Sequence, residues 1–254
     1  MAKIISLINQ KGGAGKTAST NAIAVCLKHK GYKVLGVDFD PQGYLSFSVG
    51  ANPSDRTIYH VIKRMIKCQY AIQQAPVIDV IPADSLLGNV EREFTAPGSE
   101  RMLKECLKPV MPLYDYIVID SPPELGLLSA NAVVASNVVL IPGLSDGYSL
   151  QGIIQVHETI CRIKQSFNPN LIIGGMFLIR YYPREDLSKT TAGAAEMLSE
   201  HLNIPLLDTR IRHSNVISAA MTSLQEDIID YAPTNNAVLD YVALVDELFE
   251  RGIL

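Results

Sequence analysis

The segment that most constrains this chain is a glycine-rich stretch near its start, Asn9-Gln10-Lys11-Gly12-Gly13-Ala14-Gly15-Lys16-Thr17. It follows an apolar run at 4–8, whose length and β-branched residues are typical of a buried strand. After it, apolar residues recur with helical spacing as far as Lys30, and Gly31 is placed to end that helix. A strand, a glycine loop and a helix in this order are the setting of a phosphate-binding loop.

The loop carries the residue types that a polyphosphate requires. Glycines let the backbone approach the phosphates and turn its N–H groups toward them, and the helix N-terminus adds the positive end of its dipole. We expect Lys16 to reach the β- and γ-phosphates and the Thr17 hydroxyl to ligate Mg²⁺. A simple surface turn would not explain why loop, strand and helix agree. The predicted nucleotide contacts are Lys11, Gly12, Gly13, Ala14, Gly15, Lys16, Thr17 and Ala18.

The loop departs from the ordinary P-loop in two ways. The glycine expected five residues before Gly15 is Gln10, and an additional lysine, Lys11, opens the loop. This is the deviant Walker A signature, through which the sequence resembles the ParA/MinD family of P-loop ATPases. The resemblance implies that the chain binds ATP and Mg²⁺ and hydrolyses ATP. It also implies a face-to-face homodimer, formed with ATP, in which Lys11 contacts the nucleotide of the other subunit.

An acidic motif follows the second expected strand, at 33–38. There the chain reads Asp38-Phe39-Asp40-Pro41-Gln42, and acidic residues at the carboxyl end of a parallel strand lie beside the nucleotide crevice. The motif resembles the first switch of the same family. By that resemblance Asp40 holds or polarises the attacking water, and Asp38 supports the Mg²⁺ site. The alternative is that both aspartates only cap the next turn.

A second acidic motif closes the apolar run at 116–119. Asp120 ends this run in the manner of a Walker B strand, which would bring it near the metal. The Ser121-Pro122-Pro123 that follows resembles the second switch of the family. The sequence thus predicts two sets of residues: Lys11, Lys16 and Asp40 for catalysis, and Thr17, Asp38 and Asp120 for the metal.

Strands alternate with helices along the 254 residues, 48% of which are hydrophobic. This alternation predicts a single α/β domain of the P-loop NTPase type over 1–254, with a doubly wound, mostly parallel sheet and helices on both faces. Further strands are expected at 77–82, 138–142 and 171–179, and helices at 85–94, 99–108, 150–167, 188–202 and 235–251. Asp55 is placed to cap one more helix, whose basic cluster of Lys63, Arg64 and Lys67 fits a solvated face better than a partner contact.

Composition and charge narrow the setting. The formal net charge of −4 does not indicate a globally basic nucleic-acid binder, although it leaves room for a local basic patch. Four widely spaced cysteines and a strand that begins close to Met1 favour a cytoplasmic protein without a signal peptide. The acidic helix at 235–251 would be repelled by anionic lipid, so no membrane association is expected.

Within the family, three branches fit poorly. Iron–sulfur relatives need cluster-binding cysteines, MinD-type ATPases need a basic amphipathic tail, and large plasmid ParA proteins carry an N-terminal helix-turn-helix domain. None of these features is seen in the sequence. The Soj-like ParA proteins fit better, which implies non-specific binding of double-stranded DNA on the nucleoid and a ParB-like, centromere-binding partner that stimulates ATP hydrolysis.

DNA binding would rest on local arginines that reach phosphates. The candidates are Arg184, which matches a DNA-contacting position of Soj-like proteins, and Arg180, Arg210 and Arg212. The second family arginine is replaced by Ile217, so Arg210 or Arg212 would have to substitute for it. The alternative is ordinary surface pairing with the carboxylates at 185, 186 and 208.

The leading hypothesis is therefore an ATPase that segregates a chromosome or a plasmid. Two alternatives use the same ATP site. One is a ParA-like ATPase that positions a protein cargo, and the other is a MinD-like, membrane-associated regulator of the division site. Because all three depend on the same loop, the ATP motifs do not separate them.

Overall fold

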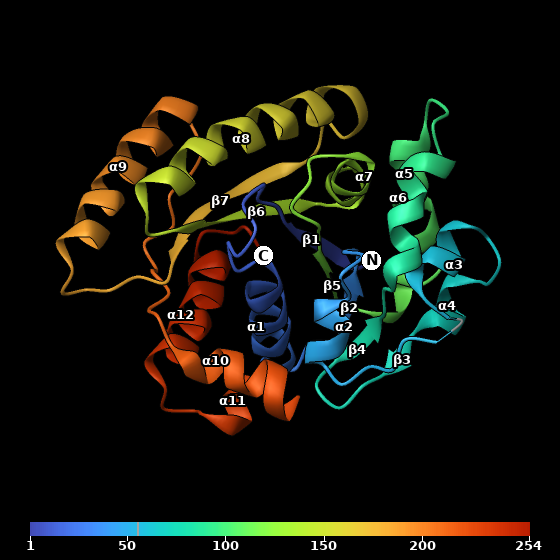
Figure 1. Ribbon diagram of the computed structural model, residues 1–254, viewed down its shortest axis with the longest axis horizontal. Helices are drawn as coiled ribbons and strands as arrows, with labels where there is room; N and C mark the ends of the chain where they lie inside the picture. The colour runs from blue at the N-terminus through green and yellow to red at the C-terminus, as the bar shows by residue number, and fades with distance from the viewer. Residues whose placement is uncertain (55) are drawn as a thin grey trace.

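The computed structural model describes residues 1–54 and 56–254, with the backbone alone described at 147–151. In these residues a seven-stranded sheet has the order β3-β4-β2-β5-β1-β6-β7 (Figure 1). Strand β3 is antiparallel to β4, and every other neighbouring pair is parallel, which confirms the mostly parallel sheet expected from the sequence. The strands are β1 Lys3–Leu7, β2 Val34–Asp38, β3 Gln73–Gln74, β4 Asp79–Ile81, β5 Tyr116–Asp120, β6 Val138–Leu144 and β7 Ile172–Ile179.

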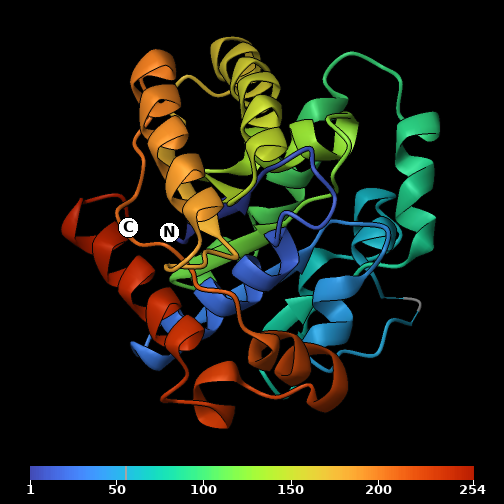
Figure 2. The ribbon, with the colours of Figure 1, turned by 60° about the vertical axis from the view of Figure 1, so that its left-hand side comes forward.

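Helices cover both faces of the sheet (Figures 1 and 2). One face carries α1 Lys16–His29, α2 Tyr44–Ser48, α10 Asn215–Ala219, α11 Ile228–Tyr231 and α12 Asn236–Glu250. The other carries α3 Ile58–Ile62, α4 Cys68–Ala71, α5 Val90–Glu93, α6 Met102–Leu107, α7 Leu127–Ala135, α8 Gly147–Phe167 and α9 Asp186–Leu202. Short 3-10 turns at Ser85–Asn89, Ser99–Arg101 and Met111–Leu113 and a π turn at Ala220–Leu224 complete the helical structure of the described residues. The three layers form the doubly wound arrangement predicted from the sequence.

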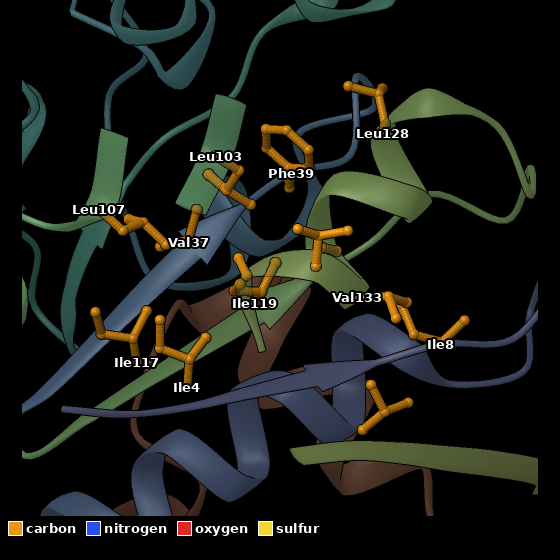
Figure 3. Packing of buried hydrophobic residues seen from close by; sticks show 14 of the residues in the cluster. Ile4, Ile8, Val37, Phe39, Leu103, Leu107, Ile117, Ile119, Leu128 and Val133 are labelled. Carbon is orange, nitrogen blue, oxygen red and sulfur yellow. The ribbon is translucent and has the colours of Figure 1, made fainter. Parts of the chain in front are cut away.

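Alternate residues of the central strands point into opposite layers. Ile5 of β1 packs toward α1 and α12, whereas its neighbour Ile4 belongs to the cluster beneath the other helices. Figure 3 shows that second cluster, in which Phe39, Leu103 and Val133 are brought together from segments far apart in the chain. Since both faces of these strands are buried, the strands appear in the sequence as unbroken apolar runs.

The segment from 51 to 110 differs most from the prediction. Asp55 lies outside the described residues, and Thr57 and His60 form a capping box at the start of α3. The expected long helix is wrong, because α3 ends at Ile62 and Arg64 adopts a left-handed φ of 58°. The helix expected at 85–94 is a 3-10 turn followed by the short α5.

Two other helices also depart from expectation. Helix α9 begins at Asp186, two residues before the start expected at Ser188. The Ser188 hydroxyl accepts the backbone N–H of Tyr182 at 3.2 Å. Helix α7 was not predicted, since nearly all of its residues are buried and it lacks a polar stripe. Among the described residues, no helix is both long enough and apolar enough to span a bilayer.

Candidate active site

The glycine loop after β1 leaves several backbone donors unused. Gly13 and Gly15 have positive φ angles of 74° and 68°, which an L side chain rarely adopts. A Cβ atom on Gly15 would also lie 2.3 Å from Cδ1 of Ile179. Within the described residues, the N–H groups of Gly13, Gly15, Lys16 and Thr17 donate to no protein acceptor. These donors at a helix N-terminus fit the phosphates of a nucleotide.

Lys16 is the buried cation of the loop. The residue is 7% exposed, and its Nζ donates to the backbone carbonyl of Asn9 at 2.9 Å. Burial lowers the pKa of Lys16, and the nearby carboxylates of Asp120 and Asp40 oppose that change. Because a phosphate oxygen carries a charge that the Asn9 carbonyl lacks, the ammonium group can exchange this neutral partner for a phosphate.

Thr17 and Asp120 meet at the carboxyl end of β5. The Thr17 hydroxyl donates to Oδ2 of Asp120 at 2.6 Å. Asp120 is fully buried, and burial, followed by the charge of Asp38, raises the pKa of Asp120 to about 8. A divalent cation beside the hydroxyl and the carboxylate would offset this buried negative charge, so these two residues fit Mg²⁺.

Both carboxylate oxygens of Asp38 accept hydrogen bonds from the loop that follows β2. Its Oδ2 accepts the backbone N–H and the hydroxyl of Ser46 at 2.7 and 2.6 Å, and its Oδ1 accepts the backbone N–H of Asp40 at 3.2 Å. Burial raises the pKa of Asp38 to about 6. These contacts hold residues 39–46 to the sheet, and the role of Asp38 at the metal stays a prediction.

Asp40 lies closer to the glycine loop. Its Oδ1 accepts the backbone N–H of Gln42 at 2.9 Å. Burial raises the pKa of Asp40, while the Gln42 hydrogen bond and the charge of Lys16 oppose that rise. The Asp40 carboxylate is thus within electrostatic reach of the lysine that we expect to bind phosphate.

The two lysines of the loop have separate partners. Lys11 Nζ pairs with Asp146 at 2.9 Å, on the segment that joins β6 to α8. The Lys11 backbone N–H donates to Oδ1 of Asn9 at 2.8 Å, which fixes the mouth of the loop. The Lys11 side chain is 37% exposed. Lys11 is therefore the loop lysine that a second molecule could reach.

A cavity of about 590 Å³ opens beside the loop. Its walls come from parts of the chain that are distant in sequence, including α1, α2, the end of β7 and the segment 211–222. The polar side chains of Ser214 and Asn215 and the rings of Tyr44 and Phe47 line it. This size and mixed lining suit the base and sugar of a nucleotide. Sequence reasoning missed these residues because no local motif links the segments.

Comparison with known proteins identifies the family of a chain that carries this loop. A protein-family profile described as an AAA domain matches residues 2–173. The sporulation initiation inhibitor protein Soj of Bacillus subtilis is 34% identical over 99% of this chain and 100% of its own length. The chain belongs to the ParA/Soj family of P-loop ATPases.

One further relative supports membership of the family, and one solved structure supports the fold. The chromosome partitioning protein ParA of Caulobacter vibrioides is 36% identical over 75% of this chain and 74% of its own. The structure of cobyrinic acid a,c-diamide synthase from Mycobacterium smegmatis, with bound ATP analogue and magnesium, matches with a TM-score of 0.87 at 26% identity. That match covers 99% of this chain and 96% of the other.

The sequence offered four candidate DNA-contacting arginines, of which only Arg184 matches a family position, and two of the four lie near one end of β7. Arg184 is exposed in the turn before α9 and has no ion pair with any described residue. Arg180, with a left-handed φ of 52°, lines the cavity beside the glycine loop. Arg184 is thus available to an external anion, whereas Arg180 borders the space that a nucleotide would occupy.

The other two arginines are engaged within the chain. Arg210 lies over the ring of Tyr181, 5.2 Å from its centroid, and pairs with Glu196 at 3.3 Å. Arg212 donates from Nη2 and Nε to the two carboxylate oxygens of Asp240, at 2.6 and 2.8 Å. A phosphate would have to compete with these partners, so Arg210 and Arg212 stay predictions of weaker standing than Arg184.

Proposed function

We propose that the protein is a Mg-ATP-dependent ATPase that dimerises with ATP, binds double-stranded DNA without sequence preference and segregates a chromosome or plasmid. The observation that carries the proposal is the likeness to Soj, which extends over almost the whole of both chains. The protein would act in the cytoplasm on the nucleoid, with a ParB-like partner that stimulates hydrolysis.

Different residues of the chain have different roles at the nucleotide. Lys16 leaves the Asn9 carbonyl and contacts the β- and γ-phosphates, and the loop N–H groups hold the same phosphates in place. Thr17 and Asp120 would hold Mg²⁺, which supplies positive charge next to the phosphates when it is bound. Asp40 accepts a hydrogen bond from the attacking water and orients it toward the γ-phosphate.

Binding to DNA would centre on Arg184. The exposed guanidinium can donate to phosphate oxygens of any sequence, which gives affinity without base recognition. The formal net charge of −4 means that such a contact must be local. It would also be weakened strongly by salt.

A second candidate is an ATPase that uses the same switch to position a protein cargo. It is favoured by the ion pairs of Arg210 and Arg212 and by Ile217, which together leave fewer free cations for DNA. A MinD-like membrane role has less support, since the surface of α12 carries the carboxylates of Asp246 and Glu250.

Retention on immobilised double-stranded DNA, compared with sedimentation on anionic liposomes, tests the proposal. We expect ATP-dependent retention on DNA, with none on liposomes. Lys16→Ala should abolish retention on DNA. Arg184→Glu should weaken retention on every DNA sequence, and the slope of the logarithm of the binding constant against the logarithm of the salt concentration should fall in magnitude by about one. Arg64→Glu, an equal change of charge on the opposite side of the molecule, should leave retention unchanged. Liposome binding, or no ATP effect on DNA, would refute the proposal.

A further inference from the structure

A basic groove is lined by residues at the end of α3 and on α6. These two helices lie on the same side of the molecule, apart from α1 (Figure 1). It has a volume of about 640 Å³. Its floor is apolar and its mouth is basic, and we define it by Ile62, Lys63, Arg64, Phe94, Arg101 and Met102. A neighbouring hollow of about 470 Å³ shares Arg64 with it and adds Lys67. The basic cluster noted in the sequence therefore borders a concave surface and not a flat helix face.

The charge of this surface is opposite to that of the whole chain. Although the formal net charge is −4, the two hollows are lined by four basic residues and by Glu105 as their acidic residue. Glu105 is already paired with Lys108 at 2.5 Å. Lys63 is paired with Glu93 at 2.6 Å. Arg64, Lys67 and Arg101 take part in no ion pair with the described residues, so the groove has uncompensated positive charge.

Arg64 holds its place at a conformational cost. Its φ of 58° lies in the left-handed region, where glycine is favoured over any side chain. Arg64 and Cys106 both line the two hollows, and the charge of Arg64 opposes the rise that burial causes in the pKa of the Cys106 thiol. Arg64 thus combines a strained backbone with an unpaired charge where the two hollows meet. Strained residues of this kind are typical of binding surfaces.

Arg101 is oriented by an aromatic ring. Its guanidinium carbon lies 5.7 Å from the centroid of Phe167, at the end of α8. The guanidinium N–H groups of Arg101 have no acceptor among the described residues, so they are available to donate. The planar guanidinium matches a carboxylate, with two parallel hydrogen bonds.

We propose that the basic groove binds an acidic peptide segment of a partner protein, with carboxylates on Arg64 and Arg101 and an apolar side chain on the floor at Ile62 and Met102. The apolar floor distinguishes this occupant from a sugar–phosphate backbone, which has no large apolar side chain to place there. Charge complementarity identifies the peptide as acidic. The inference does not depend on the proposed function, because the groove shares no residue with the nucleotide cavity.

The test is fluorescence anisotropy of a short labelled peptide in which glutamates flank a Leu-Phe pair, measured without nucleotide. We expect binding that weakens with salt and is at least about tenfold tighter than that of the same peptide with glutamines. Arg64→Glu and Arg101→Glu should each weaken it by about tenfold or more. Arg184→Glu is the matched control, because α9 lies on the opposite side of the molecule from α6 (Figures 1 and 2), and it should change binding by less than about twofold.

Arg64→Gly provides a second variant that is expected to fold well. Glycine suits the left-handed backbone at this position, so the variant removes the charge without disturbing the chain. If Arg64→Gly binds the acidic peptide as tightly as the unmodified protein, the proposal is wrong. Equal affinity for the glutamine peptide, or full displacement by free glutamate or inorganic phosphate, would also overturn it in favour of a non-specific or small-anion surface.

Discussion

Asp38 and Asp40 lie two positions apart, yet their surroundings give them different tasks. Asp38 is enclosed by Ser46 and the backbone of Asp40, so its charge is already used by the protein. Asp40 accepts one backbone hydrogen bond and lies near the charge of Lys16. The carboxylate with spare acceptor capacity is therefore that of Asp40.

We predict that Asp40→Ala keeps ATP binding and loses hydrolysis, by about 100-fold or more, because the orientation of water matters in the transition state and not in the ground state. A titration with a fluorescent ATP analogue and a phosphate-release assay would measure the two effects. Gel filtration with ATP should show a persistent dimer. A variant that hydrolyses ATP normally would exclude Asp40 from the reaction.

Glu247 shows a different use of a carboxylate, in stability. It accepts the backbone N–H groups of Asp208 and Thr209 at 2.7 and 2.9 Å and pairs with Arg251 at 2.7 Å. Burial alone would raise the pKa of Glu247, but the hydrogen bonds from Thr209 and Asp208 and the charge of Arg251 outweigh it and lower the pKa. The folded protein thus favours the ionised form.

We predict that Glu247→Gln lowers the free energy of unfolding by about 1.5–3 kcal/mol at pH 7. Since the folded pKa of Glu247 lies below its unfolded value, its contribution is present above about pH 4.5 and is lost as the pH falls through the folded value. Urea unfolding at several pH values should show the difference between variant and unmodified protein shrinking in acid. A difference that grows in acid would contradict this account.

At the scale of elements, α12 is the support of α1. The two helices lie side by side (Figures 1 and 2). Ser19 Oγ and the Tyr241 hydroxyl lie 2.9 Å apart between them, Lys30 pairs with Asp246, and Leu248 is fully buried. Asp240 of α12 also accepts hydrogen bonds from Arg212, in the segment 211–222 that lines the nucleotide cavity. The nucleotide site therefore depends on a helix that contributes little of its own surface to it.

We predict that Leu248→Ala lowers the free energy of unfolding by about 2–5 kcal/mol, because a cavity would remain between α12 and the core. Leu239 on the same helix is 46% exposed and is the matched control. Leu239→Ala should change stability by less than about 0.5 kcal/mol. Similar losses from the two variants in thermal or urea unfolding would show that α12 does not pack as described.

The elements that sequence reasoning predicted well are those with a local cause. Strands β1, β2, β5 and β6 are apolar runs, and α1 and α12 have helical spacing and an end signal, so each could be identified alone. Helix α3 was predicted too long because the left-handed turn at Arg64 has no sequence signal such as glycine. Helix α7 was missed because its environment, and not its own pattern, makes it a helix.

The residues of the candidate site also differ in how far the sequence could predict them, according to whether they belong to a local motif. The glycine loop, Asp40 and Asp120 belong to short motifs, so their meeting at one edge of the sheet could be predicted. The ion pair between Arg212 and Asp240 could not be predicted from the sequence, because only the packing of α12 brings these two residues together. The walls of the nucleotide cavity likewise come from segments that only the fold brings together.

At the scale of the whole molecule, Lys11 is the residue whose partner would differ between the monomer and the proposed dimer. In the monomer it is paired with Asp146, and in a twofold dimer it would contact the nucleotide of the facing subunit. We predict that Lys11→Ala alone binds ATP as a monomer and neither dimerises nor turns over, because a pair of such subunits lacks both contacts between Lys11 and the facing nucleotide. Gel filtration and phosphate release would measure this.

Mixing two inactive variants tests whether Lys11 acts across the dimer. In a mixed pair, the Lys11→Ala subunit keeps Asp40 and faces an intact Lys11 from an Asp40→Ala subunit, so one of the two sites is complete. We expect ATP hydrolysis to reappear on mixing. If Lys11 served its own subunit, neither site would be complete, and the mixture would stay as inactive as its components.

The packing of α12 on α1 has a consequence for synthesis on the ribosome. The two residues joined at Ser19 and Tyr241 are 222 positions apart. At about 5–20 residues per second, the first helix would emerge on the order of ten to forty seconds before its cover exists. During that interval its apolar face is a surface for chaperones, and an unfinished chain is unable to complete its nucleotide cavity. We expect unfinished chains therefore to be kept from capturing ATP and pairing with mature copies until translation is almost complete.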